Sequence, residues 1–191
     1  MYSKLIKNAF NEHADVLNKT LKSISKKIEE SSDVIAKSLK SGGTIFWCGN
    51  GGSAADSQHI AAEFVGRYKK NRKPLRSIAL TTDSSVLTCV ANDYSYEEIF
   101  SRQLSALGRV GDILVVITTS GESENIKLAL LQAKKMKIKT IALLGKKGGV
   151  CKNYADIPLI IQSDTTSRIQ EIHILIEHLI CELVEKKLGL D

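Results

Sequence analysis

The first forty residues carry apolar side chains at helical spacing. These side chains recur three, four or seven residues apart, at Ile6, Phe10, Leu17, Leu21, Ile24 and Ile28. This spacing predicts an amphipathic helix. Ser31, Ser32 and Asp33 offer caps for a second helix over 34–39, closed by the glycines at 42–43. A stripe of this length can pack on its own domain or on another subunit, and periodicity alone leaves both open.

After Gly43 the pattern changes to short apolar runs that alternate with helix-period segments. The runs lie at 44–48, 76–80, 113–118, 140–144 and 157–161. The helical segments lie at about 53–68, 84–91, 96–107, 123–136 and 166–187. This alternation is typical of a parallel α/β sheet. We therefore expect one domain over 1–191, with N-terminal helices over 1–42 and an α/β core over 43–191.

Composition narrows the class of partner. The net charge is +6, but aromatic residues make up only 5% of the chain. The basic run Lys69, Lys70, Arg72 and Lys73 has no interleaved aromatic side chain, which indicates a solvated surface rather than a nucleic-acid platform. The four cysteines are scattered, and no run resembles a signal peptide or a membrane span. We expect a cytoplasmic protein that binds neither nucleic acid nor a membrane.

Ligands of parallel sheets bind beyond the carboxyl ends of the strands, so the loops there are the first candidates. The loop 49–55 is rich in glycine, opens a helix, and adds the polar side chains of Asn50 and Ser53. Glycine backbone and free N–H groups at a helix start suit a phosphate. A plain strand-to-helix turn is the structural alternative. A dinucleotide fingerprint also fits the glycines, but the expected acidic residue is replaced by the basic run at 69–72.

A second loop of the same kind follows the run 113–118. It carries hydroxyls at Thr118, Thr119, Ser120 and Ser123 around Gly121. Helix capping would need only one of these hydroxyls. Two anion cradles on one cleft favour a phosphorylated polyol over a pyrophosphate. The pair Asn92-Asp93 is ordinary turn chemistry when taken alone.

Two helices carry candidates for metal binding or proton transfer. His59 and Glu63 are four residues apart and therefore share one helix face. Such a pair can bind a divalent metal or act as acid and base, although it is more often a surface contact. On the last helix, the spacing of Gln170 and His178 lets both face one cleft, whereas His173 points elsewhere. A structural role for His178 remains the alternative.

Four blocks of the chain carry a resemblance to a known family. They are the stretch CGNGGSAADSQHIAAEFVGRY over 48–68, Ala91-Asn92-Asp93, the Thr-Ser-Gly-x-Ser loop over 119–123, and RIQEIHI over 168–174. In this order they resemble the sugar isomerase (SIS) family of phosphosugar-binding domains. The resemblance implies a flavodoxin-like three-layer sandwich around a five-stranded parallel sheet, preceded by N-terminal helices.

The resemblance also implies an activity and a site. The activity is the isomerisation of sedoheptulose 7-phosphate to D-glycero-D-manno-heptose 7-phosphate by a zinc-binding homotetramer, on the way to nucleotide-activated heptoses for surface polysaccharide. The implied metal site is His59, Glu63, Gln170 and His178. The implied acid–base pair is Glu63 and His178. The implied substrate contacts are Asn50, Gly51, Gly52, Ser53, Glu63, Asn92, Asp93, Thr118, Thr119, Ser120, Ser123 and Gln170.

Two positions depart from the family pattern, and two rival functions follow from the same resemblance. Thr118 stands where serine is frequent, and Glu122 stands where asparagine is common. One rival is a non-catalytic scaffold of the DnaA-associated initiator type, which lacks the residues corresponding to Glu63 and His178. The other is a regulatory domain that binds a sugar phosphate without turning it over.

Overall fold

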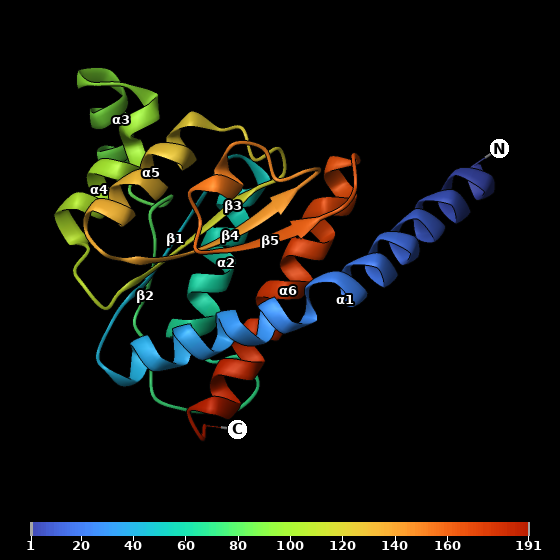
Figure 1. The fold of residues 1–191 in the computed structure, drawn as a ribbon, viewed down its shortest axis with the longest axis horizontal. Helices are drawn as coiled ribbons and strands as arrows, with labels where there is room; N and C mark the ends of the chain where they lie inside the picture. The colour runs from blue at the N-terminus through green and yellow to red at the C-terminus, as the bar shows by residue number, and fades with distance from the viewer. Residues whose placement is uncertain (1, 191) are drawn as a thin grey trace.

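The computed structural model describes residues 2–190 as a central sheet between two layers of helices (Figure 1). The sheet is fully parallel, with the strand order β2-β1-β3-β4-β5. The strands are β1 (Ile45–Gly49), β2 (Ser77–Ala79), β3 (Ile113–Thr118), β4 (Lys139–Gly145) and β5 (Ile157–Ile161). The helices are α1 (Tyr2–Lys40), α2 (Gly52–Val65), α3 (Ser84–Asp93), α4 (Ile99–Leu107), α5 (Glu124–Lys135) and α6 (Thr166–Lys187), with short 3-10 turns η1 (Tyr96–Glu98) and η2 (Cys151–Asn153). The predicted α/β sandwich is confirmed.

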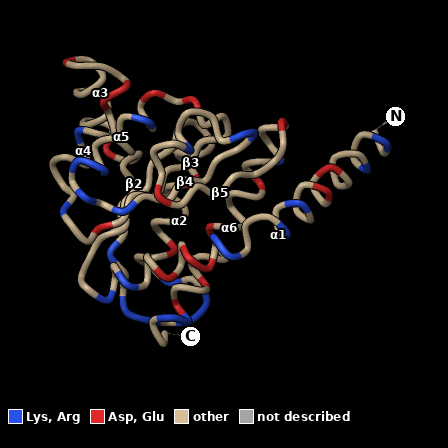
Figure 2. The backbone as a smooth tube through the Cα atoms, in the orientation of Figure 1, with Lys and Arg blue, Asp and Glu red and all other residues tan. Residues whose placement is uncertain are grey.

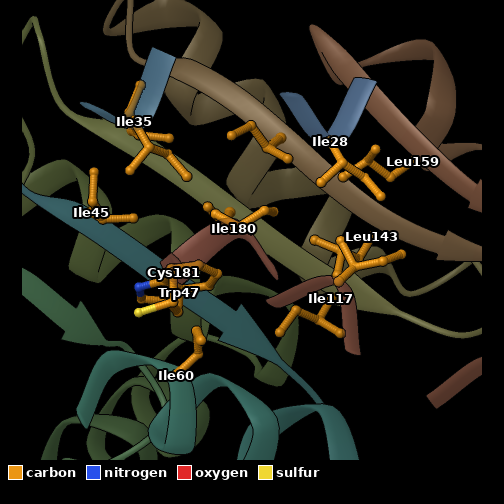
Figure 3. Packing of buried hydrophobic residues seen from close by; sticks show 14 of the residues in the cluster. Ile28, Ile35, Ile45, Trp47, Ile60, Ile117, Leu143, Leu159, Ile180 and Cys181 are labelled. Atoms are coloured by element: carbon orange, nitrogen blue, oxygen red, sulfur yellow. The ribbon is translucent and has the colours of Figure 1, made fainter. Parts of the chain in front are cut away.

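The two faces of the sheet bury separate apolar clusters, because side chains alternate along each strand. Helices α1, α2 and α6 cover one face, and α3, α4 and α5 cover the other (Figure 1). Figure 3 shows Ile35 of α1 and Ile180 of α6 in one cluster with Trp47 of β1. All three side chains are fully buried. Burying an isoleucine contributes about 1.5–3 kcal/mol, so this cluster ties α1 and α6 to the sheet.

The N-terminal region is one helix where the sequence predicts two. Ser31 and Ser32 are buried, and their hydroxyls donate to the carbonyls of Lys27 and Ile28, at 2.7 Å and 2.9 Å. A serine whose hydroxyl bonds back to its own helix satisfies itself without ending that helix. The predicted caps are therefore wrong, because Ser31 and Ser32 face the core within a continuous α1.

Other boundaries move by a few residues. Helix α2 ends at Val65, short of the predicted Tyr68, and the segment after it turns back toward α6. Helix α3 continues through Asn92 and Asp93, which occupy its last turn. Both changes occur at helix ends, where local propensity is weakest and tertiary contacts decide.

The sheet order places a topological switch point between β1 and β3. The chain leaves β1 toward β2 on one side, and later strands are added on the other side of β1. In sheets of this order the ligand binds at the carboxyl ends of these two strands. The glycine-rich loop after β1 and the hydroxyl-rich loop after β3 are therefore neighbours.

Charge and hydropathy add two further observations. Figure 2 shows Lys and Arg along α1, around α4 and along the loop below α2, rather than along one face. Among residues 2–190, no helix is both long and apolar enough to cross a bilayer.

Candidate active site

The loop after β1 is shaped by two glycines. Gly51 has φ 58°, a conformation that suits glycine, and it precedes the first turn of α2. Gly52 lies under the side chain of Gln170, where a Cβ atom would come within 2.5 Å of Nε2. The loop after β1 and helix α6 therefore meet at Gly52, where a Cβ atom would displace the end of the Gln170 side chain.

Asn50 is held by a side-chain network that joins the two loops. Its Nδ2 donates to Oδ1 of Asn125, and its Oδ1 accepts from Nδ2 of Asn125, both at 2.9 Å. The hydroxyl of Tyr96 donates to the same Oδ1 at 3.0 Å. Since Oδ1 already accepts two hydrogen bonds, the remaining capacity of the Asn50 amide is its second N–H. Asn50 is thereby oriented as a hydrogen-bond donor toward a ligand.

The loop after β3 gathers hydroxyl groups at the start of α5. The Oγ1 of Thr118 lies 3.4 Å from Oγ of Ser120 and 3.4 Å from Oγ of Ser123. Ser123 occupies the N-cap of α5, yet its side chain makes no capping hydrogen bond. The Ser123 hydroxyl therefore leaves the N–H groups in the first turn of α5 free, and these N–H groups lie close to the loop hydroxyls. Such an arrangement favours the binding of an anion.

Glu122 departs from the family pattern at the edge of this loop. Its side chain is exposed, and its carboxylate lies beside Gly149 in the loop after β4. Its backbone N–H donates to Oγ of Ser120 at 3.1 Å. The extra negative charge therefore makes no hydrogen bond with the loop hydroxyls.

Helices α2 and α6 bring most of the remaining candidates together. Gln170 of α6 donates Nε2 to Oδ2 of Asp56 at 2.9 Å. One helical turn further along α2, Nε2 of His59 lies 2.9 Å from Nε2 of His178. Oε1 of Glu63 lies 3.8 Å from the same nitrogen of His59. The predicted meeting of α2 and α6 side chains in one place is thus a feature of the structure.

The donor types at this place are those that zinc accepts. His59, His178 and Glu63 would supply two imidazole nitrogens and a carboxylate oxygen. Gln170, the fourth residue of the implied set, is turned toward Asp56. Within residues 2–190, no three His, Cys, Asp or Glu side chains are gathered tightly enough to enclose a metal ion. These residues therefore fit zinc by the chemistry of their donor atoms. The donors come from two helices that are in contact through His59 and His178.

Two buried ionisable groups lie behind this face of α6. Burial, helped by the neighbouring Asp56 carboxylate, raises the pKa of Glu177 to about 8. Burial lowers the pKa of His173 to about 4. Both groups are thus mostly uncharged at neutral pH, because burial disfavours their charged forms. His173 belongs to the core, whereas His178 faces α2, so the prediction that His173 points elsewhere agrees with the structure.

Asn92 and Asp93 stand apart from the other candidates. They bond to each other at 2.8 Å, and Cys89 donates to Asp93. No hydrogen bond or ion pair of the described chain connects them to the loops or to α6.

A cavity of about 120 Å³ lies between Asn50, Gly51 and Tyr96. Larger hollows, such as one of about 330 Å³ beside Lys137 and Asp156, contain no candidate residue.

Three residues of this site are not predicted from the sequence: Asp56, Tyr96 and Asn125. Asp56 precedes His59 by three and Glu63 by seven residues, a spacing that places all three on one face of α2 and could have revealed it. Asn125 and Tyr96 have no such local signal. They are recognised only because folding brings them to Asn50.

Replacing Asn125 by alanine should weaken substrate binding. The change frees the Asn50 amide to rotate, and loss of one oriented hydrogen bond corresponds to about a 5- to 10-fold rise in KM. Steady-state kinetics with a sugar phosphate measures this. Gln103→Ala is the matched control, because Gln103 is also buried but bonds only to the carbonyls of Leu80 and Ile99. An equal rise in KM for both variants would contradict the assigned role of Asn125.

Comparison with known proteins agrees with this geometry. The model of the SIS domain family matches residues 10–145. Phosphoheptose isomerase of Clostridium acetobutylicum is 54% identical over 84% of this chain and 82% of its own, and that of Akkermansia muciniphila is 50% identical over 97% and 98%. The structure of phosphoheptose isomerase from Neisseria gonorrhoeae superposes with a TM-score of 0.93 at 37% identity, covering 97% of this chain and 100% of that one. On this evidence the chain belongs to the SIS domain family.

Proposed function

We propose that this protein is an aldose–ketose isomerase that converts sedoheptulose 7-phosphate to D-glycero-D-manno-heptose 7-phosphate. The observation that carries the proposal is the contact of His59 with His178 of α6, with Glu63 beside His59 on α2, the helix that begins at a phosphate cradle. His59 is seven residues, or about 10 Å, along α2 from Gly52. A long phosphosugar, bound by its phosphate at one end and reactive at the other, suits this spacing. The names of the relatives support the heptose phosphate as substrate.

The reaction needs two proton transfers that these side chains can perform. Glu63 takes the proton from C1 of the ketose and returns it to C2, through an enediolate. His178 moves the hydroxyl proton from the oxygen on C1 to the oxygen on C2. One carboxylate and one imidazole at hydrogen-bonding reach of adjacent carbons suffice for this. The hydroxyls after β3, the Asn50 amide and the start of α5 hold the phosphate.

The decisive experiment is a direct assay with sedoheptulose 7-phosphate, followed by NMR detection of the aldose product. Product formation is the expected result. If no product forms with or without added zinc, the scaffold function of the initiator type becomes the better assignment.

The proposed isomerisation would open a route to nucleotide-activated heptoses for surface polysaccharide. We place it in the cytoplasm, which keeps the unpaired thiols of Cys48, Cys89, Cys151 and Cys181 reduced.

We further propose zinc as the resident metal, held by His59, Glu63, His178 and Gln170. A divalent cation at this place would polarise the carbonyl and stabilise negative charge on the enediolate oxygens. Removal of metal by a chelator should lower kcat at least 10-fold, and zinc should restore it. Elemental analysis of the treated protein provides the control. Full activity in protein shown to be free of metal would contradict the proposal.

We propose the homotetramer that the family resemblance implies, and α1 supports association between copies. The N-terminal end of α1 extends past the body of the molecule (Figure 1), and the helix exposes large apolar side chains at Tyr2, Leu5, Ile6, Phe10 and Leu21. Phe10 alone is 74% exposed. Exposed apolar surface of this extent favours burial against a second copy. A neighbouring copy would also enclose the site, in which the His59 side chain is 45% exposed.

Replacing Phe10 by glutamate should shift the assembly toward smaller species. The proposed assembly would bury the apolar stripe that contains Phe10, and burying a charge there opposes association. Light scattering after size-exclusion chromatography measures the mass in solution. Asn8→Glu is the control, because it places the same charge on the same exposed segment of α1. A wild-type monomer, or equal effects of both variants, would contradict the proposed assembly.

A further inference from the structure

Arg72 lies within a basic run that the sequence analysis assigns to a solvated surface, and the structure corrects this. Its side chain is only 1% exposed and bonds to Glu185 of α6, whose side chain is 3% exposed. We propose that Arg72 and Glu185 form a clamp that positions the carboxylate of Glu63 and the imidazole of His178 for proton transfer. This inference rests on the proposed function and names two positioning residues for it.

Arg72 holds the carboxyl end of α2. Its Nη2 donates to the carbonyl of Glu63 at 2.7 Å, and its Nη1 donates to the carbonyl of Phe64 at 2.7 Å. These carbonyls belong to the last turn of α2, which has no intrahelical donors for them and no basic residue of its own. A positive charge at a helix carboxyl end is also favourable. Arg72 is therefore bonded directly to the backbone of the proposed base.

Glu185 connects the same guanidinium to α6. Its Oε1 accepts from Nε of Arg72 at 2.7 Å and from the backbone N–H of Tyr68 at 3.2 Å. Buried ion pairs contribute little net stability, because desolvation cancels most of the attraction. The contribution of this pair is geometric, because the planar guanidinium of Arg72 bonds in fixed directions to α2 and to α6 simultaneously. Lysine could not reproduce this, since it carries a single point of charge on a flexible stem.

The clamp also reaches His178 through Tyr68. The Tyr68 ring stacks on the His178 imidazole, with ring centroids 5.6 Å apart and planes inclined by 22°. Its backbone is bonded to Glu185, so the position of the ring depends on the clamp. Three contacts then join α2 and α6 in order along their lengths: Asp56 with Gln170, His59 with His178, and Arg72 with Glu185.

The place of the clamp predicts which kinetic constant it controls. One phosphate cradle lies at the start of α2 and the other at the start of α5, and Arg72 binds the end of α2. Loosening that end displaces Glu63 and His178 while leaving the phosphate contacts in place. Misplacing reacting groups by about 1 Å can cost 100-fold in rate. We expect kcat to fall about 10- to 100-fold in Arg72→Lys and Glu185→Gln, with KM changed less than about 2-fold.

The test combines kinetics with NMR of histidine-labelled protein. The His178 resonance, assigned with His178→Gln, should lose the ring-current shift of Tyr68 in both clamp variants. Tyr68→Leu gives the reference for that loss. Lys187→Met is the matched control, because Lys187 also bonds from α6, to Asp33 of α1, but does not touch α2. It should keep wild-type kcat and the wild-type His178 resonance.

The outcomes separate the clamp from the proposed function. If wild-type protein shows no isomerase activity, the function fails, and the His178 resonance alone still decides whether the clamp exists. An unchanged resonance and unchanged kcat in folded Arg72→Lys would overturn the clamp. If Arg72→Lys does not fold, Glu185→Gln decides. If that variant also fails to fold, Tyr68→Leu decides, and unchanged kcat in Tyr68→Leu would overturn the action of the clamp on His178.

Discussion

Replacing Glu63 by glutamine should lower turnover about 1,000-fold while phosphosugar binding persists. The amide keeps the shape of the side chain but cannot take a proton from carbon, and general-base contributions are about 10²- to 10⁴-fold. Glu63 lies near the end of α2, whereas the phosphate cradles lie at the starts of α2 and α5, so the contacts that provide affinity stay intact. Stopped assays with sedoheptulose 7-phosphate measure kcat, and calorimetric titration measures binding.

The control for this variant is the same change at an exposed carboxylate. Glu30 lies on the solvent side of α1, and Glu30→Gln should leave kcat unchanged. Turnover above about a tenth of the wild-type value in folded Glu63→Gln would remove Glu63 as the base. Loss of binding together with turnover would instead show that phosphosugar binding itself depends on Glu63.

Replacing Gly121 by alanine should damage both stability and the phosphate loop. Gly121 has φ 72°, and a Cβ atom there would lie 2.3 Å from the carbonyl oxygen of Gly148. Backbone atoms of the loop after β4 would have to move, and a positive φ in alanine adds about 1 kcal/mol. Together we expect a loss of about 2–4 kcal/mol in the free energy of unfolding. Because the N–H of Gly121 donates to Thr118 at 3.2 Å, KM should also rise about 10-fold.

Gly111→Ala separates the cost of a positive φ from the cost of the collision with Gly148. Gly111 has φ 97°, but no atom lies within 4 Å of the position of its Cβ. This variant carries the strain of the backbone conformation without the collision, so it should cost only about 1 kcal/mol and leave KM unchanged. Urea denaturation of both variants gives the comparison. Equal losses of stability would show that the approach of Gly121 to Gly148 contributes nothing.

Local patterns along the chain predict the five strands, most of the helices and half of the site. The five apolar runs predict the strands because residues buried on both faces of a sheet must be continuously apolar. The loop after β1 and the loop after β3 are recognisable because glycines and hydroxyls at a helix start have few purely structural uses. His59 and Glu63 share a helix face by spacing alone. Each of these signals is local, and local patterns are readable without knowing the fold.

Which distant residues meet depends on how the helices and the sheet pack together. Spacing turns His173 away from the side of Gln170 but leaves a structural role open for His178, and packing buries His173 in the core while His178 contacts His59. Asn125 becomes a partner of Asn50 only because β1 and β3 are adjacent in the sheet. Arg72 looks like a solvated residue until Glu185 and the end of α2 surround it. Contacts between residues about a hundred positions apart depend on the packing of whole helices, and no local pattern encodes that packing.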